Sequence, residues 1–323
     1  EFERQLKRFL NVPDLLFLSN GTIALQIAIK ALGLKGEVIT TPFSYVATTS
    51  TILWEGCIPV YVDVHPGSLN IDPSKIEAAI TERTSAILAT HVYGNPCDID
   101  SIDQVAKRYN LRVIYDAAHC FGTTYKGRSV FVYGDISTTS FHATKVFHTI
   151  EGGAVFASDD SLLKKMELMR NFGHQQPEHF AEVGINAKNS EFHAAMGLAN
   201  LKYADDLLKV RKDQHSWYDE YLKELNKEKL KISREAGFNY AYFPVLFESE
   251  AMTTRVVDEL ERHSIFSRRY FYPGLNGIKI FNPTPLPFSE SYMNRVLCLP
   301  LYHSLTQSEI EHICQIITRT VQC

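Results

Sequence analysis

The sequence predicts an α/β protein with a mostly parallel β-sheet covered on both faces by helices. From Asn20 to about Phe156, short apolar runs alternate with segments of helical periodicity, which is the order of elements in such sheets. After about Ser190 the pattern changes to a long helical segment and a smaller mixed region. A chain of 323 residues accommodates about two domains of roughly 150 residues each. We therefore expect a large domain over residues 1–208 and a small C-terminal α/β domain over 209–323.

Six short apolar runs predict the strands of the large sheet. Short runs of this kind between helical segments are typical of buried parallel strands. We expect these strands at residues 38–40, 58–62, 86–89, 111–115, 135–141 and 153–157.

The segments between these runs predict helices. Residues 22–32 are apolar nearly all round and are followed by Gly33, which indicates a buried helix with a glycine C-cap. A helix over 44–55 is closed by Gly56, and one over 72–81 begins with Asp-Pro, a favourable N-cap and first-turn pair. The next helix has its apolar positions at i, i+3, i+4 and i+7, namely Ile102, Val105, Ala106 and Tyr109.

Beyond Ser190 the sequence predicts a connecting helix and the elements of the small domain. One long helix runs to about residue 226. A strand is expected near 241–247, and further helices are expected near 252–263 and 306–320.

Composition excludes two classes of function. The chain has 33 Lys and Arg against 37 Asp and Glu, so no basic excess favours nucleic-acid binding. No apolar run approaches the roughly 18 residues of a transmembrane helix. The chain begins at Glu1 without a signal-peptide pattern, so we expect a trimmed start and not a secreted precursor.

The cysteines and histidines predict no metal site. The six cysteines include no CxxC pair, and scattered cysteines in a chain of this length are typical of buried thiols in a reducing compartment. No ligand spacing matches a zinc site, and His142 and His148 stand six residues apart on an irregular segment. We therefore expect a soluble, cytoplasmic, globular protein.

Polar residues stand where the predicted strands end. His91, Asp116 and the segment 140–145 each follow a strand, and residues 19–22 directly precede the first buried helix. Ligands of open α/β sheets bind beyond the carboxyl ends of the strands. These residues are therefore candidates for one site.

A phosphate site is predicted at the start of the first buried helix. A helix N-terminus presents free N–H groups to an anion, Gly21 permits close backbone approach, and Thr22 adds a hydroxyl. Ser19 or Asn20 acting as a simple helix cap is the alternative. The fingerprints GxxxxGK[ST] and GxGxxG are both absent, which disfavours P-loop and dinucleotide enzymes.

Asp116 and Lys145 predict the chemistry. A buried carboxylate requires a cationic partner, and a desolvated lysine with a lowered pKa becomes a nucleophile toward carbonyls. A pyridoxal cofactor needs this lysine, an acid for its pyridine nitrogen and a phosphate cradle. A solvated surface lysine is the alternative for Lys145 taken alone.

The motifs together resemble one family. The sequence is similar to the DegT/DnrJ/EryC1/StrS sugar-nucleotide aminotransferases over nearly its whole length, although members usually have further N-terminal residues. The resemblance implies the aspartate-aminotransferase fold (fold type I), with a seven-stranded large-domain sheet, and pyridoxal 5'-phosphate as cofactor. The motifs are SNGTIAL (19–25), HVYG (91–94), DAAHCFG (116–122), SFHATK (140–145), EGGAVF (151–156) and GINAKNSEFHAAMGL (184–198).

The resemblance implies a role for each matched residue. Lys145 corresponds to the Schiff-base lysine, which also moves the proton between the donor's Cα and the cofactor. Asp116 corresponds to the partner of the pyridine nitrogen, and His119 to the residue beside the phenolic oxygen. Tyr45 corresponds to an aromatic ring stacked on the pyridine.

The phosphate contacts also follow from the resemblance. Gly21, Thr22 and Ser140 match the phosphate cradle. Asn186 matches an asparagine that reaches the phosphate from the neighbouring subunit. The resemblance thus implies a homodimer whose active sites are shared across the interface.

The substrate segment is expected at SRRYFYPGL, residues 267–275. Arg268 and Arg269 either bind the diphosphate or the donor's carboxylate, or form a solvated pair. Tyr270 either stacks on a thymine or packs the domain interface. With FHTIEGG, this segment is most similar to enzymes that aminate C4 of a dTDP-4-keto-6-deoxyhexose, with L-glutamate as the amino donor.

Three alternatives stay open to differing degrees. One is an aminotransferase for a 3-keto sugar nucleotide. Another is a regulatory protein that binds the cofactor without turnover, which the retained Lys145, Asp116, His119 and Ser140 disfavour. The dehydratase branch of the family replaces the lysine, typically by histidine, and Lys145 argues against it. The sugar, the aminated carbon and the nucleotide depend on pocket shape.

Overall fold

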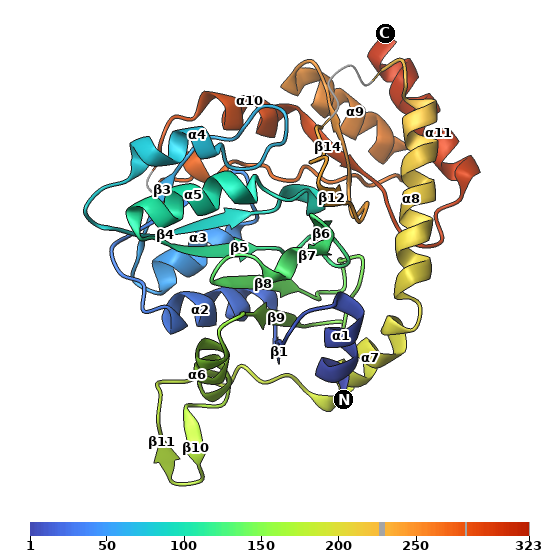
Figure 1. Cartoon of the computed structure of the whole chain (residues 1–323). Helices are drawn as coiled ribbons and strands as arrows, with labels where there is room; N and C mark the ends of the chain where they lie inside the picture. Colours follow the sequence, from blue (N-terminus) through green and yellow to red (C-terminus); the bar gives the residue numbers. More distant parts are fainter. Residues whose placement is uncertain (226–229, 282, 323) are drawn as a thin grey trace.

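A seven-stranded sheet forms the centre of the large domain (Figure 1). The computed structural model describes residues 1–225, 230–281 and 283–322. The strand order is β1-β9-β8-β5-β4-β2-β3; β9 runs antiparallel to both neighbours, and the other six strands share one direction. The mostly parallel sheet is therefore confirmed. Its strands are β1 (Leu16–Leu18), β2 (Glu37–Thr40), β3 (Ile58–Tyr61), β4 (Thr84–Thr90), β5 (Arg112–Asp116), β8 (Ile136–Ser140) and β9 (Gly153–Phe156).

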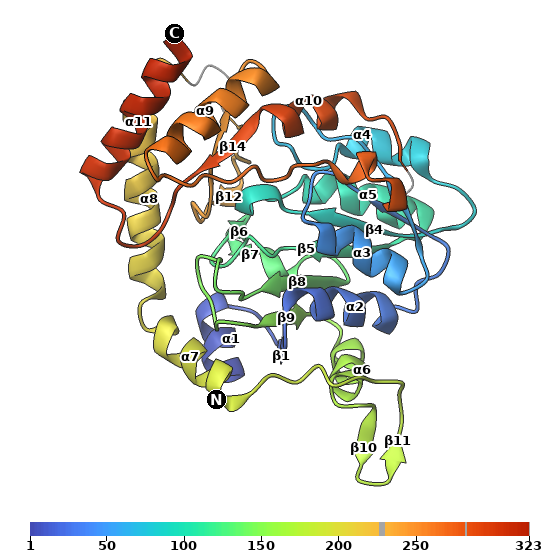
Figure 2. The same cartoon turned by 180° about the vertical axis from the view of Figure 1, so that it is seen from behind.

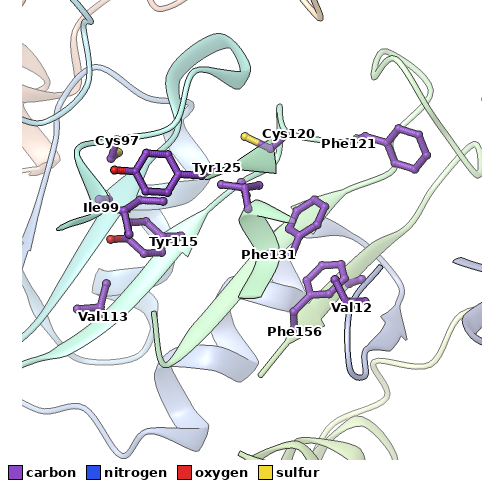
Figure 3. Close-up of a cluster of buried hydrophobic side chains, with 14 of the residues drawn as sticks. Val12, Cys97, Ile99, Val113, Tyr115, Cys120, Phe121, Tyr125, Phe131 and Phe156 are labelled. Carbon is purple, nitrogen blue, oxygen red and sulfur yellow. The ribbon is translucent and has the colours of Figure 1, made fainter. Parts of the chain in front are cut away.

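Helices bury both faces of the sheet. Successive side chains of each strand point to opposite faces and pack against different helices. On β2, Ile39 packs toward one face with α1 (Phe2–Leu10), α4 (Pro73–Ile76) and α5 (Ile99–Tyr109). Val38 packs toward the other face with α2 (Gly21–Ala31), α3 (Val46–Trp54) and α6 (Asp160–Arg170). Figure 3 shows part of the first cluster, in which the rings of Phe131 and Phe156 stack 4.3 Å apart.

Six of the seven strands were predicted, and β1 was missed. At three residues, β1 is shorter than the four-residue runs from which strands are normally recognised. It is held instead by antiparallel pairing with β9.

One predicted helix is shorter in the structure than expected from the sequence. The helix expected over 72–81 ends as an α-helix at Ile76 and continues as a 3₁₀ turn over Glu77–Ala79. Thr81 is drawn out of the helix because its hydroxyl donates to the Glu37 carboxylate at 2.5 Å. Tertiary hydrogen bonding thus overrides local helix propensity here.

The long helix expected after Ser190 is two helices. α7 (Glu191–Leu201) packs against α1, and α8 (Ala204–Tyr221) packs against α11 (Gln307–Gln322). The break at Lys202–Tyr203 lets one segment follow the large domain and the next follow the small one (Figures 1 and 2). The predicted end near residue 226 lies outside the described residues.

The small domain packs helices on a two-stranded sheet. β13 (Phe243–Leu246) and β14 (Val296–Leu299) pair antiparallel, with α8, α9 (Glu250–Arg262) and α11 around them. The predicted boundary at residue 208 falls within α8. Later segments return to the large domain: β12 (Ala236–Gly237) pairs with β6 (Thr124–Tyr125), itself paired with β7 (Arg128–Ser129).

Three further features complete the molecule. A hairpin of β10 (His174–Gln176) and β11 (His179–Phe180) projects away from the body below α6 (Figure 1). Every cysteine except Cys323, which lies outside the described residues, is buried and free, as expected. Within the described chain, no helix combines the length and apolarity needed to cross a bilayer.

Asp63 links the segment around residue 288 to the large sheet through hydrogen bonds. Following β3, it accepts hydrogen bonds from the backbone N–H groups of Phe288 (3.1 Å) and Ser289 (2.8 Å). These residues begin α10 (Pro287–Arg295), so a residue 225 positions earlier caps this helix. Burial alone raises the pKa of this carboxyl, but the hydrogen bonds from Ser289 and its neighbours hold it below the ordinary 3.8.

We expect Asp63→Ala to lower the free energy of unfolding by about 2 kcal/mol, because buried donors lose their acceptor. Asp159→Ala removes the purely local cap of α6 and should cost about 1 kcal/mol. Urea denaturation of both variants measures the difference. Since the folded pKa lies below 3.8, the Asp63 contribution is complete above that pH and is lost as pH falls through the folded pKa. Equal losses in the two variants would contradict the long-range role of Asp63.

Candidate active site

A cavity of about 630 Å³ lies at the carboxyl ends of β4, β5 and β8 and the N-terminus of α2. The structure brings together most of the residues that the sequence predicted for the site. Those lining the cavity are Gly21, Thr22, Tyr45, Asp116, His119, Ser140, Lys145, Arg268 and Tyr270.

Asp116 ends β5 and lies at the base of the cavity. Its side chain is buried, and its two oxygens accept hydrogen bonds from the Thr48 hydroxyl at 2.7 Å and the Ala118 N–H at 3.1 Å. Burial raises the pKa of this carboxyl, whereas Thr48, the Ala118 N–H and the nearby Lys145 charge act in the opposite direction. These three interactions stabilise the ionised form of the Asp116 carboxyl although it is buried.

A chain of buried hydroxyls continues from Thr48. The Ser44 hydroxyl lies 2.7 Å from that of Thr48 and 2.9 Å from that of Thr90. Since Thr48 donates to Asp116, its oxygen is free to accept from Ser44. None of these three residues was predicted from the sequence. Thr48 stands three residues after Tyr45 in the segment PFSYVAT (42–48), but nothing in the local pattern places it beside Asp116.

His119 lies on the loop after β5 and is neutral. Its Nδ1 accepts from the Tyr93 N–H at 3.2 Å, so the proton of the neutral ring is on Nε2. Burial, and secondarily the Lys145 charge, lower the pKa of this ring well below its ordinary value. His119 therefore offers an N–H donor without a charge.

His119 contacts two aromatic rings. Phe271 stacks on it with ring centroids 5.7 Å apart and planes within 2°, and Tyr242 lies 4.5 Å from it. Asn239 fixes the same loop by donating to the carbonyl oxygens of His119 (2.7 Å) and Phe121 (2.9 Å). These three residues come from the last third of the chain and carry no sequence signal for this role.

Lys145 follows β8 on a short irregular segment that also lines the cavity. Its environment is desolvated, and among the described residues no carboxylate lies within 4 Å of its Nζ. Burial lowers its pKa to about 8, and the Arg268 charge acts in the same direction, against the opposing effect of Asp116. A lysine with this pKa has a larger share of free amine near neutral pH than an ordinary lysine, which is the property that a nucleophile toward carbonyls requires.

The start of α2 meets the end of β8. Asn20 caps the helix by accepting from the Ile23 N–H at 2.9 Å, which leaves the first-turn N–H groups of Gly21 and Thr22 to face an anion. A Cβ on Gly21 would lie 2.8 Å from the Cβ of Ser140, so glycine is required for this approach. Both the cap and the phosphate cradle predicted from the sequence fit this geometry.

Two of the three predicted substrate residues line this cavity, and the third does not. Arg268 and Tyr270 line the cavity, and the Arg268 guanidinium donates to the Tyr270 hydroxyl at 2.8 Å. Arg269 lies outside this cavity. It pairs with Glu250 at 3.2 Å and stacks over the Tyr272 ring at 3.6 Å. This position gives no support to the prediction that Arg269 binds substrate.

Asn186 lies outside the cavity, in an exposed segment bridged to Asn171. Its predicted contact requires a second subunit, so that role stays a prediction. Tyr45 lines the cavity and is 58% exposed, so more than half of its surface is open to a ligand.

The chain matches known proteins over nearly its whole length. The model of the DegT/DnrJ/EryC1/StrS aminotransferase family matches residues 1–318. The chain is 41% identical to the dTDP-4-amino-4,6-dideoxy-D-glucose transaminase of Shigella dysenteriae, over 97% of this chain and 87% of that protein. It is 37% identical to the Escherichia coli protein of the same name, over 98% of this chain and 88% of the relative.

Solved structures have the same fold. The crystal structure of DesI in the presence of its TDP-sugar product superposes with a TM-score of 0.90 and is 32% identical, covering 99% of this chain and 84% of DesI. Helicobacter pylori PseC, an aminotransferase of pseudoaminic acid biosynthesis, superposes with a TM-score of 0.90 at 27% identity, covering 99% of this chain and 90% of PseC. The chain is an aminotransferase and belongs to the DegT/DnrJ/EryC1/StrS family.

Proposed function

We propose that this enzyme uses pyridoxal 5'-phosphate to move an amino group from L-glutamate to C4 of a dTDP-linked 4-keto-6-deoxy sugar. The observation that carries the proposal is the convergence of Lys145, Asp116 and the α2 N-terminus on one cavity. The relatives that make or bind thymidine-linked sugars support the acceptor class. We also infer a cytoplasmic location.

The cavity fits the cofactor in three respects. The close approach of Gly21 to Ser140 leaves a cradle of N–H and hydroxyl groups for a phosphate. Asp116 supplies a buried acceptor for a pyridine N–H, and Lys145 supplies a desolvated amine. Pyridoxal phosphate, when bound, supplies a reactive carbonyl and a ring that accepts electrons.

The chain's own residues would act as follows. Lys145 would carry the proton from Cα of the donor, because its amine is desolvated and unpaired with any carboxylate of the described residues. Asp116 would hold the pyridine nitrogen of the cofactor in its protonated form by remaining ionised. His119 would donate its Nε2–H to the phenolic oxygen of the cofactor, and its neutral ring would take no proton from the donor.

A second copy of the chain would complete the site. The segment from the hairpin to the start of α7 exposes large apolar side chains, with Val183 77% and Phe192 88% exposed. Adjacent exposed apolar residues favour an interface with another protein surface. Asn186 lies within this segment, so we propose a homodimer in which it reaches the partner's phosphate site.

The proposal is tested with purified protein, pyridoxal phosphate and L-glutamate. We expect about one 2-oxoglutarate per subunit without acceptor, and continued turnover once a dTDP-4-keto-6-deoxyhexose is added. GDP- and UDP-linked 4-keto sugars and a dTDP-linked 3-keto sugar are the competing acceptors. Cofactor binding without 2-oxoglutarate would instead indicate a regulatory protein, and preferential turnover of the 3-keto sugar would move the reaction to C3.

A further inference from the structure

A second cavity of about 800 Å³ adjoins the first on the side of the small domain. The two cavities share Thr144, Lys145, Arg268 and Tyr270 in their walls. The remaining wall comes from α8, the residues just before β13, the segment after α9, the end of β14 with the residues after it, and the first turns of α11. A ligand in this space would therefore lie beside the reactive amine.

Arg211, on α8, is the unusual residue in this wall. It is only 9% exposed, and its Nη1 is shielded from solvent without any hydrogen-bond acceptor. No carboxylate of the described residues lies within 4 Å of it. Burial lowers its pKa to about 10, so the guanidinium still carries its charge at neutral pH. A buried charge without a partner is costly, and an anionic ligand would remove this cost.

A second guanidinium faces the same space. Arg268 donates to the Tyr270 hydroxyl but pairs with no carboxylate in the described chain. Tyr242, also in the wall, interacts electrostatically with both arginines, so both charges lie near the same ring. Among the described wall residues Glu309 alone carries a carboxylate, and it accepts the N–H and hydroxyl of Thr306, each at 2.7 Å. The cavity is therefore cationic, with its one acid already engaged.

We propose that this second cavity is the subsite for the amino donor, in which Arg211 and Arg268 bind the two carboxylates of a dicarboxylate amino acid. The inference rests on the proposed function and deepens it. A guanidinium presents a planar fork of N–H donors that matches a carboxylate, and two such groups match a ligand with two carboxylates. The donor's amino group must reach Lys145, and Lys145 lies in the same wall.

The diphosphate of the nucleotide sugar is the other oxyanion that could enter. The burial of Arg211 favours the smaller anion. A diphosphate carries more charge than one nine-tenths-buried guanidinium can balance, and it is joined to a nucleoside and a sugar that need open space. The two sources are separated by using glutarate, a dicarboxylate without an amino group, and dTDP as probes.

The experiment uses the cofactor-loaded enzyme and its Arg211→Gln variant. Titration calorimetry gives the affinity for glutarate and for dTDP, and single-turnover kinetics gives the glutamate dependence of the first half-reaction. We expect Arg211→Gln to weaken glutarate binding and raise the glutamate KM by about 10- to 100-fold, with dTDP affinity unchanged. Arg211→Lys should recover part of the loss, because the charge is kept and the fork is not.

Two controls keep the result interpretable. Arg255→Gln removes an exposed arginine of α9 that donates to a backbone carbonyl at 3.0 Å, and should leave both affinities unchanged. An arginine unpaired in the free protein adds nothing to folding, so Arg211→Gln should unfold at the same urea concentration as wild type or higher. Arg268→Gln should weaken glutarate in the same way, which keeps the inference testable if Arg211→Gln fails to fold.

The outcomes are distinct from those of the proposed function. If wild type releases 2-oxoglutarate and Arg211→Gln binds glutarate equally well, the subsite assignment is wrong while the aminotransferase reaction stands. If Arg211→Gln loses dTDP affinity and keeps glutarate affinity, the arginine serves the nucleotide. If wild type releases no 2-oxoglutarate from glutamate, the proposed function itself fails.

Discussion

Replacement of Lys145 by alanine is expected to lower the rate of amino transfer from L-glutamate by about 1,000-fold or more, because the same side chain is nucleophile and proton carrier. Pyridoxal phosphate should still bind through the α2 N-terminus and Asp116, but without covalent capture. The visible absorbance of the bound cofactor should then differ from that of wild type and resist dialysis less well.

The pH dependence of capture gives an independent test of the same residue. With a pKa of about 8, Lys145 is mostly protonated below that pH and mostly the free amine above it. The rate at which the apoprotein captures added pyridoxal phosphate should therefore rise with pH through about 8, well below the 10.5 of an ordinary lysine. Lys107→Ala, which removes an exposed lysine paired with Asp103, is the control. If Lys145→Ala and Lys107→Ala behave alike, the assignment of the lysine is wrong.

Asp116→Asn should also have a large effect, a loss of about 100- to 10,000-fold in amino transfer. The amide keeps the shape of the carboxyl group but cannot balance a proton on the pyridine nitrogen. We expect pyridoxal phosphate to bind more weakly as well, because a buried acceptor is replaced by a neutral group. Single-turnover rates and equilibrium dialysis with the cofactor measure the two effects.

Thr48→Val tests how the carboxylate is kept ionised. Burial already raises the pKa of Asp116, and the Thr48 hydroxyl opposes this shift. Its loss should raise that pKa further, so the acid limb of the pH–rate profile should move to higher pH. At neutral pH we expect a loss of about 10-fold, equivalent to one hydrogen bond to a charged group.

Two variants separate this effect from general damage. Thr51→Val removes a hydroxyl one helical turn away that donates only to backbone carbonyls of α3. It should leave the pH profile in place. Thr48→Ser keeps the hydroxyl and should restore most of the activity. An acid limb that does not move in Thr48→Val would show that the hydroxyl does not control Asp116.

Much of the site was accessible from the sequence because the groups stand at strand and helix ends. Asp116 ends β5, Lys145 follows β8 and Gly21 begins α2, and parallel strands bring their carboxyl ends to one edge of a sheet. The family motifs then gave each of them a role. The same reasoning assigned Arg268 and Arg269 together, and the structure separates them: one faces the cavity and the other pairs with Glu250.

What the sequence could not supply are contacts between distant segments. Thr48 meets Asp116 across 68 residues, and Asp63 caps a helix 225 residues later. Phe271, in the last third of the chain, stacks on His119. The sequence around Thr48, Asp63 and Phe271 looks like that around any buried threonine, strand-end aspartate or packed aromatic residue. No local pattern therefore reveals their long-range contacts.

The sequence by itself determined the fold class, the family and the central chemistry, because periodicity and motif spacing are local properties that survive without coordinates. Only the tertiary structure decided where β1 pairs, why the helix after Ser190 breaks, which arginines face the cavities and which groups oppose the effect of burial on the pKa of Asp116. These features depend on which distant groups become neighbours when water is removed. The energy of a buried charge or hydroxyl is set by those neighbours and not by its position in the chain.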